Sequence, residues 1–296
     1  MIVTDKKYYL DNLLKAKLDL MIDRMKHGKD NLLLIDGNEG DGKSNIAIEL
    51  GYYFAHSTNR PFSLENIFFD LDKLIDFAIK TKEQVIIWDE GALGGLAAEW
   101  WSKNQKKLLK LLMVARKKKH FWIICIPKFF KLNEYLIIDR SIGLVHVYMR
   151  NGIEHGRFTY YSERAKERLY EDWKKTHIRN YRNYFSAHGS FVLGLGTKWC
   201  ETLIKEKEYD KKKDDAIMSI KDSKEEKKQH NDALIKMNTN IKIMRRAQAM
   251  GFIKKNKDIM DLLGISETTL RRYKHAIKEG KIEEVGEVDF NSATPP

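Results

Sequence analysis

The sequence predicts an α/β protein with a largely parallel sheet covered by helices, followed by a small all-α domain near its C-terminus. Short, almost wholly apolar runs at residues 32–35, 84–88 and 121–126 alternate with longer segments whose apolar residues recur at helical spacing. Such runs are typical of strands that are buried on both faces of a parallel sheet. Two short amphipathic helices after residue 255, separated by Gly264, predict the second domain.

The balance of charges favours an anionic partner. The 296 residues include 54 Lys and Arg against 42 Asp and Glu, which gives a formal net charge of +12 and a pI near 9.3. Such an excess attracts polyanions. Nucleic acid is therefore the leading candidate partner, and an anionic membrane surface is the lesser one.

No feature of the sequence indicates export or membrane insertion. The N-terminus carries charges where a signal peptide needs an apolar core, and no apolar run approaches the roughly 18 residues of a membrane span. Cys125 and Cys200 form no C-x-x-C pair, so neither a disulfide nor a zinc site is expected. We therefore expect a cytoplasmic protein with no membrane segment.

The first half of the chain predicts helices that alternate with strands. Apolar residues at helical spacing between Leu10 and Met25 predict an amphipathic helix over residues 5–27. The elements expected next are a strand at 32–35, a helix at 45–53, a strand at 67–69, a helix at 71–80 and a strand at 84–88. This alternation is the pattern of a parallel sheet that is covered on both faces.

The β pattern continues beyond residue 100 until a charged segment interrupts it. Asn151-Gly152, between two alternating runs, predicts a hairpin turn. Between residues 205 and 228, 17 of 24 residues are charged, which predicts a long exposed helix or a linker, and we favour a solvated tether without chemistry. The elements expected before it are a helix at 102–115, strands at 121–126, 136–138, 144–148 and 157–161, and a helix at 164–185.

A glycine-rich segment between the first apolar strand and the next helix carries the strongest motif. Residues 37–44 match G-x-x-x-x-G-K-[ST] at every fixed position, and they form a Walker A P-loop. Glycines let backbone N–H groups converge on a phosphate chain, while Lys43 reaches the β- and γ-phosphates of ATP and Ser44 ligates Mg²⁺. The expected nucleotide-binding residues are Gly37, Asn38, Glu39, Gly40, Asp41, Gly42, Lys43 and Ser44.

A second acidic motif ends the strand at 84–88. Residues 85–90, VIIWDE, form a Walker B strand in which Asp89 is expected to hold the Mg²⁺ water shell. Glu90 is expected to orient and deprotonate the attacking water, a role that a metabolic kinase does not usually need. The base-recognition tetrad of a GTPase is not apparent in the sequence. The predicted chemistry is therefore Mg²⁺-dependent hydrolysis of ATP.

Phosphoryl transfer also needs a cation for the charge that develops on the γ-phosphoryl group. Arg116 and Arg140 are the two catalytic candidates, and each is expected at a strand edge. The residues alone do not choose between them.

The order of these motifs resembles a known family. GNEGDGKS, VIIWDEG, LLMVARKKKHFWIICIP and LIIDRSIGLVHV, within residues 31–161, resemble the zonula occludens toxin-like ATPases of phages and the wider FtsK/HerA-type translocases, which include DNA-packaging ATPases of small phages. The resemblance implies a P-loop NTPase fold of RecA/ASCE type, ATP and Mg²⁺ as cofactors, and a homo-oligomeric ring. It also implies that Arg116 acts on the ATP of a neighbouring subunit. The expected location of a phage-encoded protein is the host cytoplasm.

The C-terminal region carries a helix-turn-helix pattern. Residues 256–263 predict a short helix, Gly264 a turn, and Ser266 the N-cap of a second helix that ends at Gly280. Residues 241–280 hold ten Lys and Arg against four Asp and Glu, a balance of +6. Three-helix units also bind proteins, but the polar and basic outer face favours double-stranded DNA. The expected DNA-binding residues are Ser266, Thr268, Arg271, Arg272 and Lys274.

Two functions share these motifs. The first is a ring-forming ATPase that translocates or packages DNA, and the second is an ATP-switched DNA-binding regulator or replication-initiation factor. A motor predicts ATP turnover that any DNA sequence stimulates, whereas a regulator predicts one preferred site. The predicted parts are a P-loop ATPase domain at 1–162, a helical and charged linker region at 163–238, a helix-turn-helix domain at 239–280 and an acidic tail at 281–296.

Overall fold

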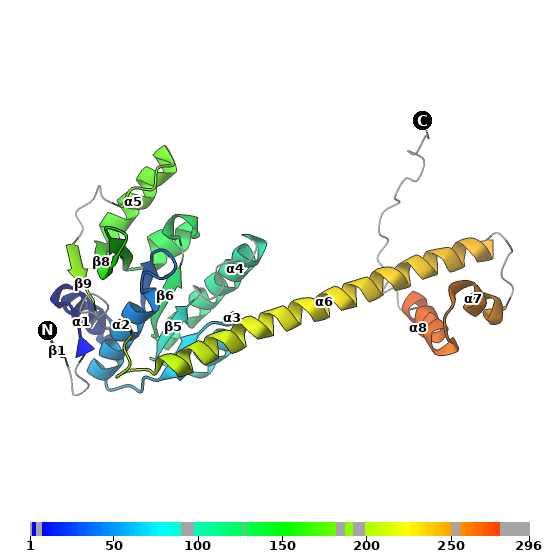
Figure 1. Cartoon of the computed structure of the whole chain (residues 1–296), viewed down its shortest axis with the longest axis horizontal. Helices are drawn as coiled ribbons and strands as arrows, with labels where there is room; N and C mark the ends of the chain where they lie inside the picture. The colour runs from blue at the N-terminus through cyan, green and yellow to red at the C-terminus, as the bar shows by residue number, and fades with distance from the viewer. Residues whose placement is uncertain are drawn as a thin grey trace. The chain divides into compact units, whose positions relative to one another are not determined.

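The structure is a computed structural model in which the chain forms two compact units, Met1–Met218 and Ser219–Pro296 (Figure 1). The first unit contains a seven-stranded sheet with helices on both faces, and the second is helical. The predicted mixed α/β architecture is confirmed. No helix in the described part of the chain is long and apolar enough to cross a lipid bilayer. The structure describes residues 2–3, 8–89, 98–126, 128–181, 187–191, 199–249, 251 and 255–278, so the predicted acidic tail lies outside it.

Five neighbouring strands, from one edge of the sheet inward, are parallel. β3 (Asn31–Asp36) lies between β6 (Phe121–Ile126) and β7 (Gly143–Arg150). β5 (Val85–Asp89) and β4 (Ile67–Phe68) follow beyond β6, which gives the order β4-β5-β6-β3-β7-β8-β9. The strand that leads into the P-loop is thus separated from the Walker B strand by β6. This largely parallel sheet is consistent with the predicted P-loop NTPase fold.

The last two strands of the sheet run antiparallel. β8 (Glu154–Ser162) pairs with β7, and β9 (Ala187–Ser190) pairs with β8. The turn between β7 and β8 contains Asn151 and Gly152, whose φ angles are 54° and 71°. Positive φ at both positions is what the tight hairpin turn requires. The hairpin predicted from Asn151-Gly152 is therefore confirmed.

The strand predicted at residues 136–138 is wrong. Leu136–Arg140 form one turn of π-helix instead. The side chain of Asn133 accepts a hydrogen bond from the backbone N–H of Tyr135 at 3.0 Å, which favours a helical turn at this point. Three apolar residues in a row do not by themselves distinguish a buried strand from a buried helical turn.

Each face of the sheet is covered by a separate group of helices (Figure 1). α1 (Asn12–Lys26), α2 (Lys43–Ser57) and the start of α6 (Glu206–Ala249) pack on one face. α3 (Leu71–Lys80), α4 (Ala98–Val114) and α5 (Glu163–Thr176) pack on the other. Along β3, Leu33 and Ile35 face the first group while Leu32 and Leu34 face the second. Both faces of β3 are therefore buried, as the apolar run predicts.

Two helix boundaries differ from the prediction. α1 begins at Asn12 rather than near residue 5, because the Asp11 carboxylate accepts the backbone N–H of Leu13 at 2.8 Å and caps the helix. The residues before it form the short pair β1 (Ile2–Val3) and β2 (Tyr8–Tyr9). α5 ends at Thr176 rather than at residue 185. His177, directly after Thr176, takes the left-handed conformation with φ of 56°, which ends the helix.

From Glu206 onward the charged segment belongs to a single long helix, α6. The expectation that the segment is solvated is wrong for the first turns of this helix. Tyr209 and Ala216 are buried in the core of the first unit, which extends to Met218. The remainder of α6 belongs to the second unit.

The second unit is built from the end of α6, α7 (Asn256–Leu263) and α8 (Glu267–Lys278). Gly264 ends α7 with φ of 59°, and the Ser266 hydroxyl accepts the backbone N–H of Thr269 at 3.3 Å. The buried side chains that hold the three helices together are Met237, Ile241, Met244, Ile259, Leu270 and Tyr273. Two predicted helices and their inner faces are thus present.

Candidate nucleotide and metal site

The P-loop leaves β3 at the carboxyl edge of the sheet and turns directly into α2. Gly37, Gly40 and Gly42 have φ angles of 152°, 83° and 98°. A Cβ atom on Gly37 would collide with the carbonyl oxygen of Val147 in β7, so the loop passes in contact with the neighbouring strand. The first N–H groups of a helix have no intrahelical acceptor, and α2 begins at Lys43. The loop and this helix start together form a site suited to phosphate.

Lys43 lies within the loop rather than in solvent. Its side chain is buried, and its ammonium donates hydrogen bonds to the carbonyl oxygens of Gly37 at 2.9 Å and Asn38 at 2.6 Å. The Asp41 carboxylate accepts the backbone N–H of Asn38 at 2.8 Å and so fixes the turn of the loop. Because the contacts of the Lys43 ammonium are to neutral carbonyl groups, its positive charge can neutralise an incoming phosphate.

Asp89 lies at the same edge of the sheet, at the end of β5. The strand register aligns Asp89 with Cys125 of β6, and Cys125 with Ile35 of β3. Two strand spacings of about 4.8 Å place the Asp89 backbone about 10 Å from β3. Ser44 is half-buried in the first turn of α2. The two predicted metal ligands are therefore at one edge, whereas the predicted base Glu90 lies outside the described residues.

A tyrosine from α6 contacts the predicted metal ligand Asp89. The Tyr209 hydroxyl donates a hydrogen bond to Asp89 Oδ2 at 2.5 Å, and the side chain of Ser44 adjoins the same phenol. Burial, together with the adjacent Asp89 carboxylate, raises the pKa of Tyr209 well above its ordinary value, so the hydroxyl keeps its proton. No motif in the sequence points to Tyr209. The sequence feature that could have indicated a buried Tyr209 is an aromatic residue in a charged segment, two helical turns before Ala216.

A second buried carboxylate directly precedes the P-loop. Asp36 accepts hydrogen bonds from Nδ1 of His146, at 2.9 Å, and from the Tyr181 hydroxyl. The rings of His146 and Tyr181 stack with centroids 3.6 Å apart. Burial, and then the charge of Asp36, raises the pKa of Tyr181. These three residues, none of them singled out in the sequence, fix the point where β3 becomes the P-loop.

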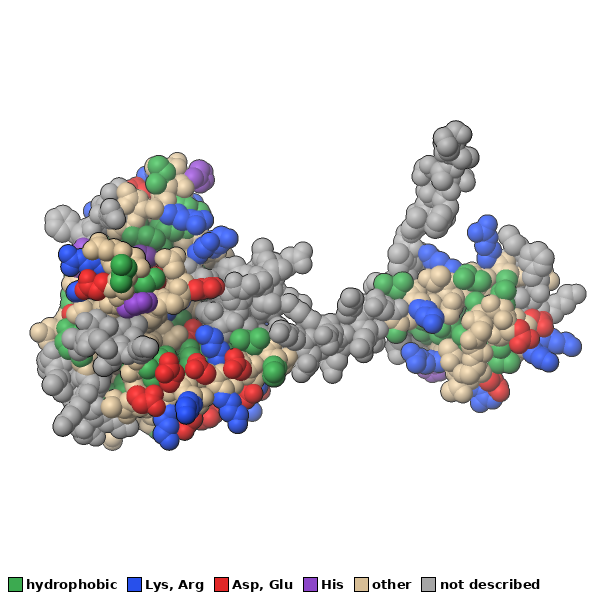
Figure 2. Space-filling view, viewed as in Figure 1, with side chains coloured by type: hydrophobic (Ala, Val, Ile, Leu, Met, Phe, Trp, Pro, Cys, Tyr) green, Lys and Arg blue, Asp and Glu red, His purple; other side chains and the backbone are tan. Residues whose placement is uncertain are grey.

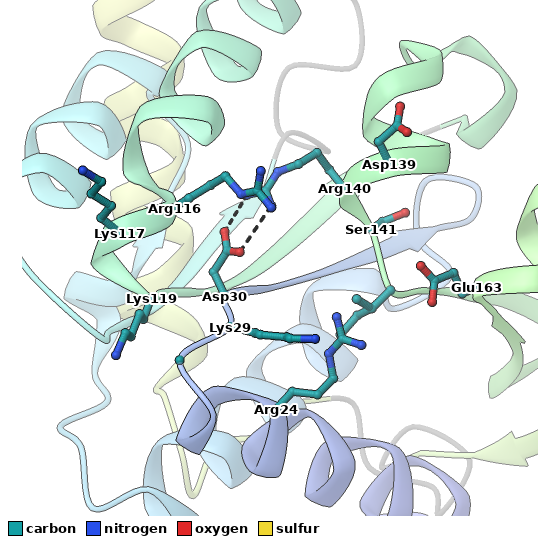
Figure 3. A pocket seen from close by; sticks show the side chains of 12 residues that line it. Arg24, Lys29, Asp30, Arg116, Lys117, Lys119, Asp139, Arg140, Ser141 and Glu163 are labelled. Atoms are coloured by element: carbon teal, nitrogen blue, oxygen red, sulfur yellow. Dashed lines mark hydrogen bonds and ion pairs between the residues drawn. The ribbon is translucent and has the colours of Figure 1, made fainter.

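Arg116 and Arg140 lie together at the opposite edge of the sheet. They line a cavity of about 580 Å³ beside the segments that precede β3, β6 and β7 (Figure 3). Arg140 forms a two-pronged ion pair with Asp30, with N–O distances of 2.6 and 3.3 Å, and donates to the carbonyl oxygen of Leu112 at 3.3 Å. Arg116 is exposed in the 3₁₀ turn Ala115–Lys118, and its side chain has no hydrogen bond or ion pair to a residue of the described ranges.

The length of β3 separates this basic cavity from the P-loop. Asp30 directly precedes the strand and Gly37 directly follows it. Six strand residues span about 20 Å, so neither arginine reaches a nucleotide on the P-loop of its own subunit. Arg116 is free to meet a group on another molecule, whereas Arg140 is held by Asp30.

The residues predicted to contact DNA are all exposed, on α8 or at its N-cap. Arg271 pairs with Glu267 at 2.8 Å, and Lys274 donates to Oδ1 of Asn256 at 2.6 Å. The side chain of Arg272 makes no hydrogen bond or ion pair with another residue that the structure describes. Figure 2 shows exposed Lys and Arg side chains on the second unit. The predicted set is Ser266, Thr268, Arg271, Arg272 and Lys274.

Comparison with known proteins gives little guidance about this chain. No protein-family model matches it, and no curated protein matches it either. Three solved chains match, and one of them is the replication initiator DnaA bound to AMPPCP and single-stranded DNA. It is 13% identical, the match covers 95% of this chain and 91% of that chain, and the TM-score is 0.33. We draw no conclusion from so low a score.

Proposed function

We propose that this protein is a Mg²⁺-dependent ATPase that acts on double-stranded DNA. The observation that carries the proposal is the P-loop conformation at the end of β3, with Lys43, Ser44 and Asp89 at the same edge of the sheet. A hydroxyl and a carboxylate are the hard oxygen ligands that Mg²⁺ prefers. An ammonium group beside backbone N–H donors suits the phosphate chain of ATP.

Each group has a separate role in the proposed reaction. Lys43 exchanges its two carbonyl contacts for the β- and γ-phosphates, while Ser44 and Asp89 hold the metal and its water shell. When bound, Mg²⁺ supplies positive charge to the oxygens of the transferred phosphoryl group. Glu90 orients the attacking water and accepts its proton.

Arg116 is proposed to complete the site of a neighbouring subunit in a homo-oligomeric ring. The proposal is supported by its exposure and by the length of β3 that separates it from its own P-loop. A guanidinium that approaches the γ-phosphate stabilises the charge that develops in the transition state. Arg140 is the less suitable of the two candidates, because its guanidinium is engaged by Asp30.

The hydrolytic function is tested with two variants and a matched control. Lys43→Ala should weaken the binding of a fluorescent ATP analogue, whereas Glu90→Gln should bind it normally and fail to hydrolyse ATP. Glu134→Gln, which removes the charge of an exposed glutamate paired with Lys174, should leave both properties unchanged. Equal steady-state turnover of the wild type and Glu90→Gln would remove Glu90 from the mechanism.

The second unit is proposed to bind the DNA backbone through α8. Residues 241–280 carry a balance of +6, and Arg272 is exposed on the outer side of the helix. Affinity for duplex DNA should fall by about 0.9 log units per log unit of salt for each phosphate that is neutralised. Arg272→Ala should reduce the slope of log affinity against log salt by about 0.9, which is the contribution of one phosphate. Arg168→Ala, which removes an exposed arginine of α5 outside residues 241–280, serves as the control, and an unchanged slope in Arg272→Ala would exclude that contact.

Among uses of ATP hydrolysis, we propose DNA translocation or packaging, as in a phage or other mobile element. An ATP-switched DNA-binding regulator or replication-initiation factor is the alternative. Turnover measured with several unrelated duplexes distinguishes them. Equal stimulation by all duplexes supports a motor, whereas stimulation by a single sequence supports a regulator.

A further inference from the structure

The start of α6 is fixed over the metal side of the P-loop site by several independent contacts. The ring of Tyr209 packs against Trp199 and Phe69, with centroids 4.7 and 5.2 Å away. One turn later, the Lys212 ammonium donates to the carbonyl oxygen of Leu64 at 2.8 Å. Before the helix, the backbone N–H of Cys200 donates to the side chain of Asn45 in α2 at 3.0 Å. The position of Tyr209 is therefore set by its surroundings on three sides.

The hydroxyl of Tyr209 is engaged by Asp89 at this site. Asp89 can only accept, so the phenol donates its proton to Oδ2 at 2.5 Å. The side chain of Ser44 adjoins the same phenol. Only 3% of Tyr209 is exposed, so water does not replace the contact with Asp89 easily. One buried hydroxyl thus binds one of the two residues that are proposed to hold Mg²⁺ and lies beside the other.

We propose that Tyr209 competes with Mg²⁺ for Ser44 and Asp89 and must leave them when the Mg²⁺–nucleotide complex binds. The inference rests on the proposed ATPase function and concerns the same site. Mg²⁺ requires ligand oxygens at 2.0–2.1 Å in near-octahedral geometry and usually keeps several waters. A phenol oxygen 2.5 Å from Asp89 Oδ2 and beside Ser44 occupies the space that the ion and its waters need.

The competition has a direct consequence for affinity. Binding of the Mg²⁺–nucleotide complex must break a buried hydrogen bond to a carboxylate, which opposes binding. Removing such a bond changes an equilibrium constant by roughly tenfold or more. Nucleotide without metal does not need Ser44 or Asp89 and should be insensitive to Tyr209.

The test compares full-length wild type with Tyr209→Phe. Affinity for a non-hydrolysable ATP analogue is measured by calorimetry in Mg²⁺ and, separately, in EDTA. The variant should bind roughly tenfold or more tightly in Mg²⁺ and equally well in EDTA. Tyr53→Phe is the matched control, because it removes a tyrosine–carboxylate hydrogen bond of the same 2.5 Å length, to Asp19 of α1, and should not change affinity in either condition.

The possible outcomes separate this inference from the proposed function. Equal or weaker Mg²⁺-dependent binding by Tyr209→Phe, with normal binding by the wild type, overturns the competition and leaves the nucleotide site intact. Absence of analogue binding by the wild type refutes the nucleotide site itself and the inference with it.

Hydrogen exchange of the wild-type protein provides a measurement that needs no variant. If Tyr209 leaves the site, the backbone amides of residues 206–212 should exchange faster when Mg²⁺ and the analogue are added together. The analogue in EDTA should not accelerate them. Unchanged or slower exchange of these amides with Mg²⁺ and the analogue would contradict displacement of Tyr209.

Discussion

Replacing Arg140 by alanine should strongly destabilise the first unit, and the structure allows the magnitude to be estimated. The side chains of Arg140 and Asp30 are only 6% and 9% exposed. Removing one partner of a buried ion pair leaves the other charge without compensation, which costs about 3–5 kcal/mol. The carbonyl oxygen of Leu112 loses a donor in the same variant. We expect a loss at the upper part of this range.

Arg116→Ala is the matched variant, because the two arginines line the same cavity. Arg116 is exposed and holds no ion pair with a described residue, so its removal should change the free energy of unfolding by no more than about 0.5 kcal/mol. Urea unfolding distinguishes the two variants. With a slope of about 3 kcal/mol per M urea, Arg140→Ala should move the midpoint by at least about 1 M, and Arg116→Ala by less than about 0.2 M.

The double variant Asp30→Ala with Arg140→Ala identifies the cause of the loss. It should be less destabilised than the sum of its two single variants, because no buried charge remains unpaired. An Arg140→Ala protein as stable as the wild type would refute a structural role for the ion pair and would return Arg140 to the catalytic candidates.

Arg116 is expected to be needed for ATP turnover although it is not needed for stability. A subunit with Arg116→Ala and one with Lys43→Ala should each be inactive, yet a mixture should recover part of the ATP turnover. Some interfaces of the mixture pair an intact P-loop with an intact arginine, and such an arginine contributes about 10³-fold or more. A mixture that co-assembles but stays as inactive as its parents would exclude Arg116 as the residue supplied in trans.

Two further predictions concern stability. His120 is fully buried and its Nδ1 accepts the backbone N–H of Gln84 at 3.1 Å, while burial lowers its pKa. Below about pH 6.5 the unfolded chain therefore gains a proton that the folded chain does not. Below this pH the free energy of unfolding should fall by up to about 1.4 kcal/mol for each pH unit. Denaturant titrations of His120→Gln should not show this dependence on pH. If the variant keeps the same dependence, His120 is not its cause. Gly37→Ala should lower the free energy of unfolding, measured in urea, by about 2–4 kcal/mol, because the added Cβ collides with Val147. Gly40→Ala should lower it by about 1 kcal/mol, because the space around Gly40 is open. Equal losses in the two variants would contradict the close contact between Gly37 and Val147.

The features that the sequence predicted well are local in the chain. The P-loop is eight consecutive residues, and the glycines that it needs at positive φ stand inside the motif. Strands such as β3 and β6 are buried on both faces, so their apolar runs are unambiguous. The hairpin turn is likewise determined by two adjacent residues, Asn151 and Gly152.

The features that the sequence did not reveal depend on residues far apart in the chain. Arg140 was expected at a strand edge as a catalytic candidate, and its engagement by Asp30 comes from a residue 110 positions earlier. Tyr209 contacts Asp89 across 120 positions. Its neighbours in sequence are charged, so the pattern indicated a solvated helix, and only the packing of α6 on the sheet shows which side of the helix is buried.

α6 has a thermodynamic consequence beyond its place in the fold. Its first turns contact the proposed metal ligand Asp89, and its last turns supply Met237, Ile241 and Met244 to the core that holds α8. Coupling between two binding equilibria is reciprocal, so if DNA binding shifts Tyr209, DNA changes nucleotide affinity by the same factor by which the nucleotide changes DNA affinity. Tyr209→Phe lacks the hydroxyl that makes the hydrogen bond to Asp89. The change in nucleotide affinity on adding DNA is measured in the wild type and in Tyr209→Phe. The difference between the two changes is the coupling free energy that depends on this single hydrogen bond.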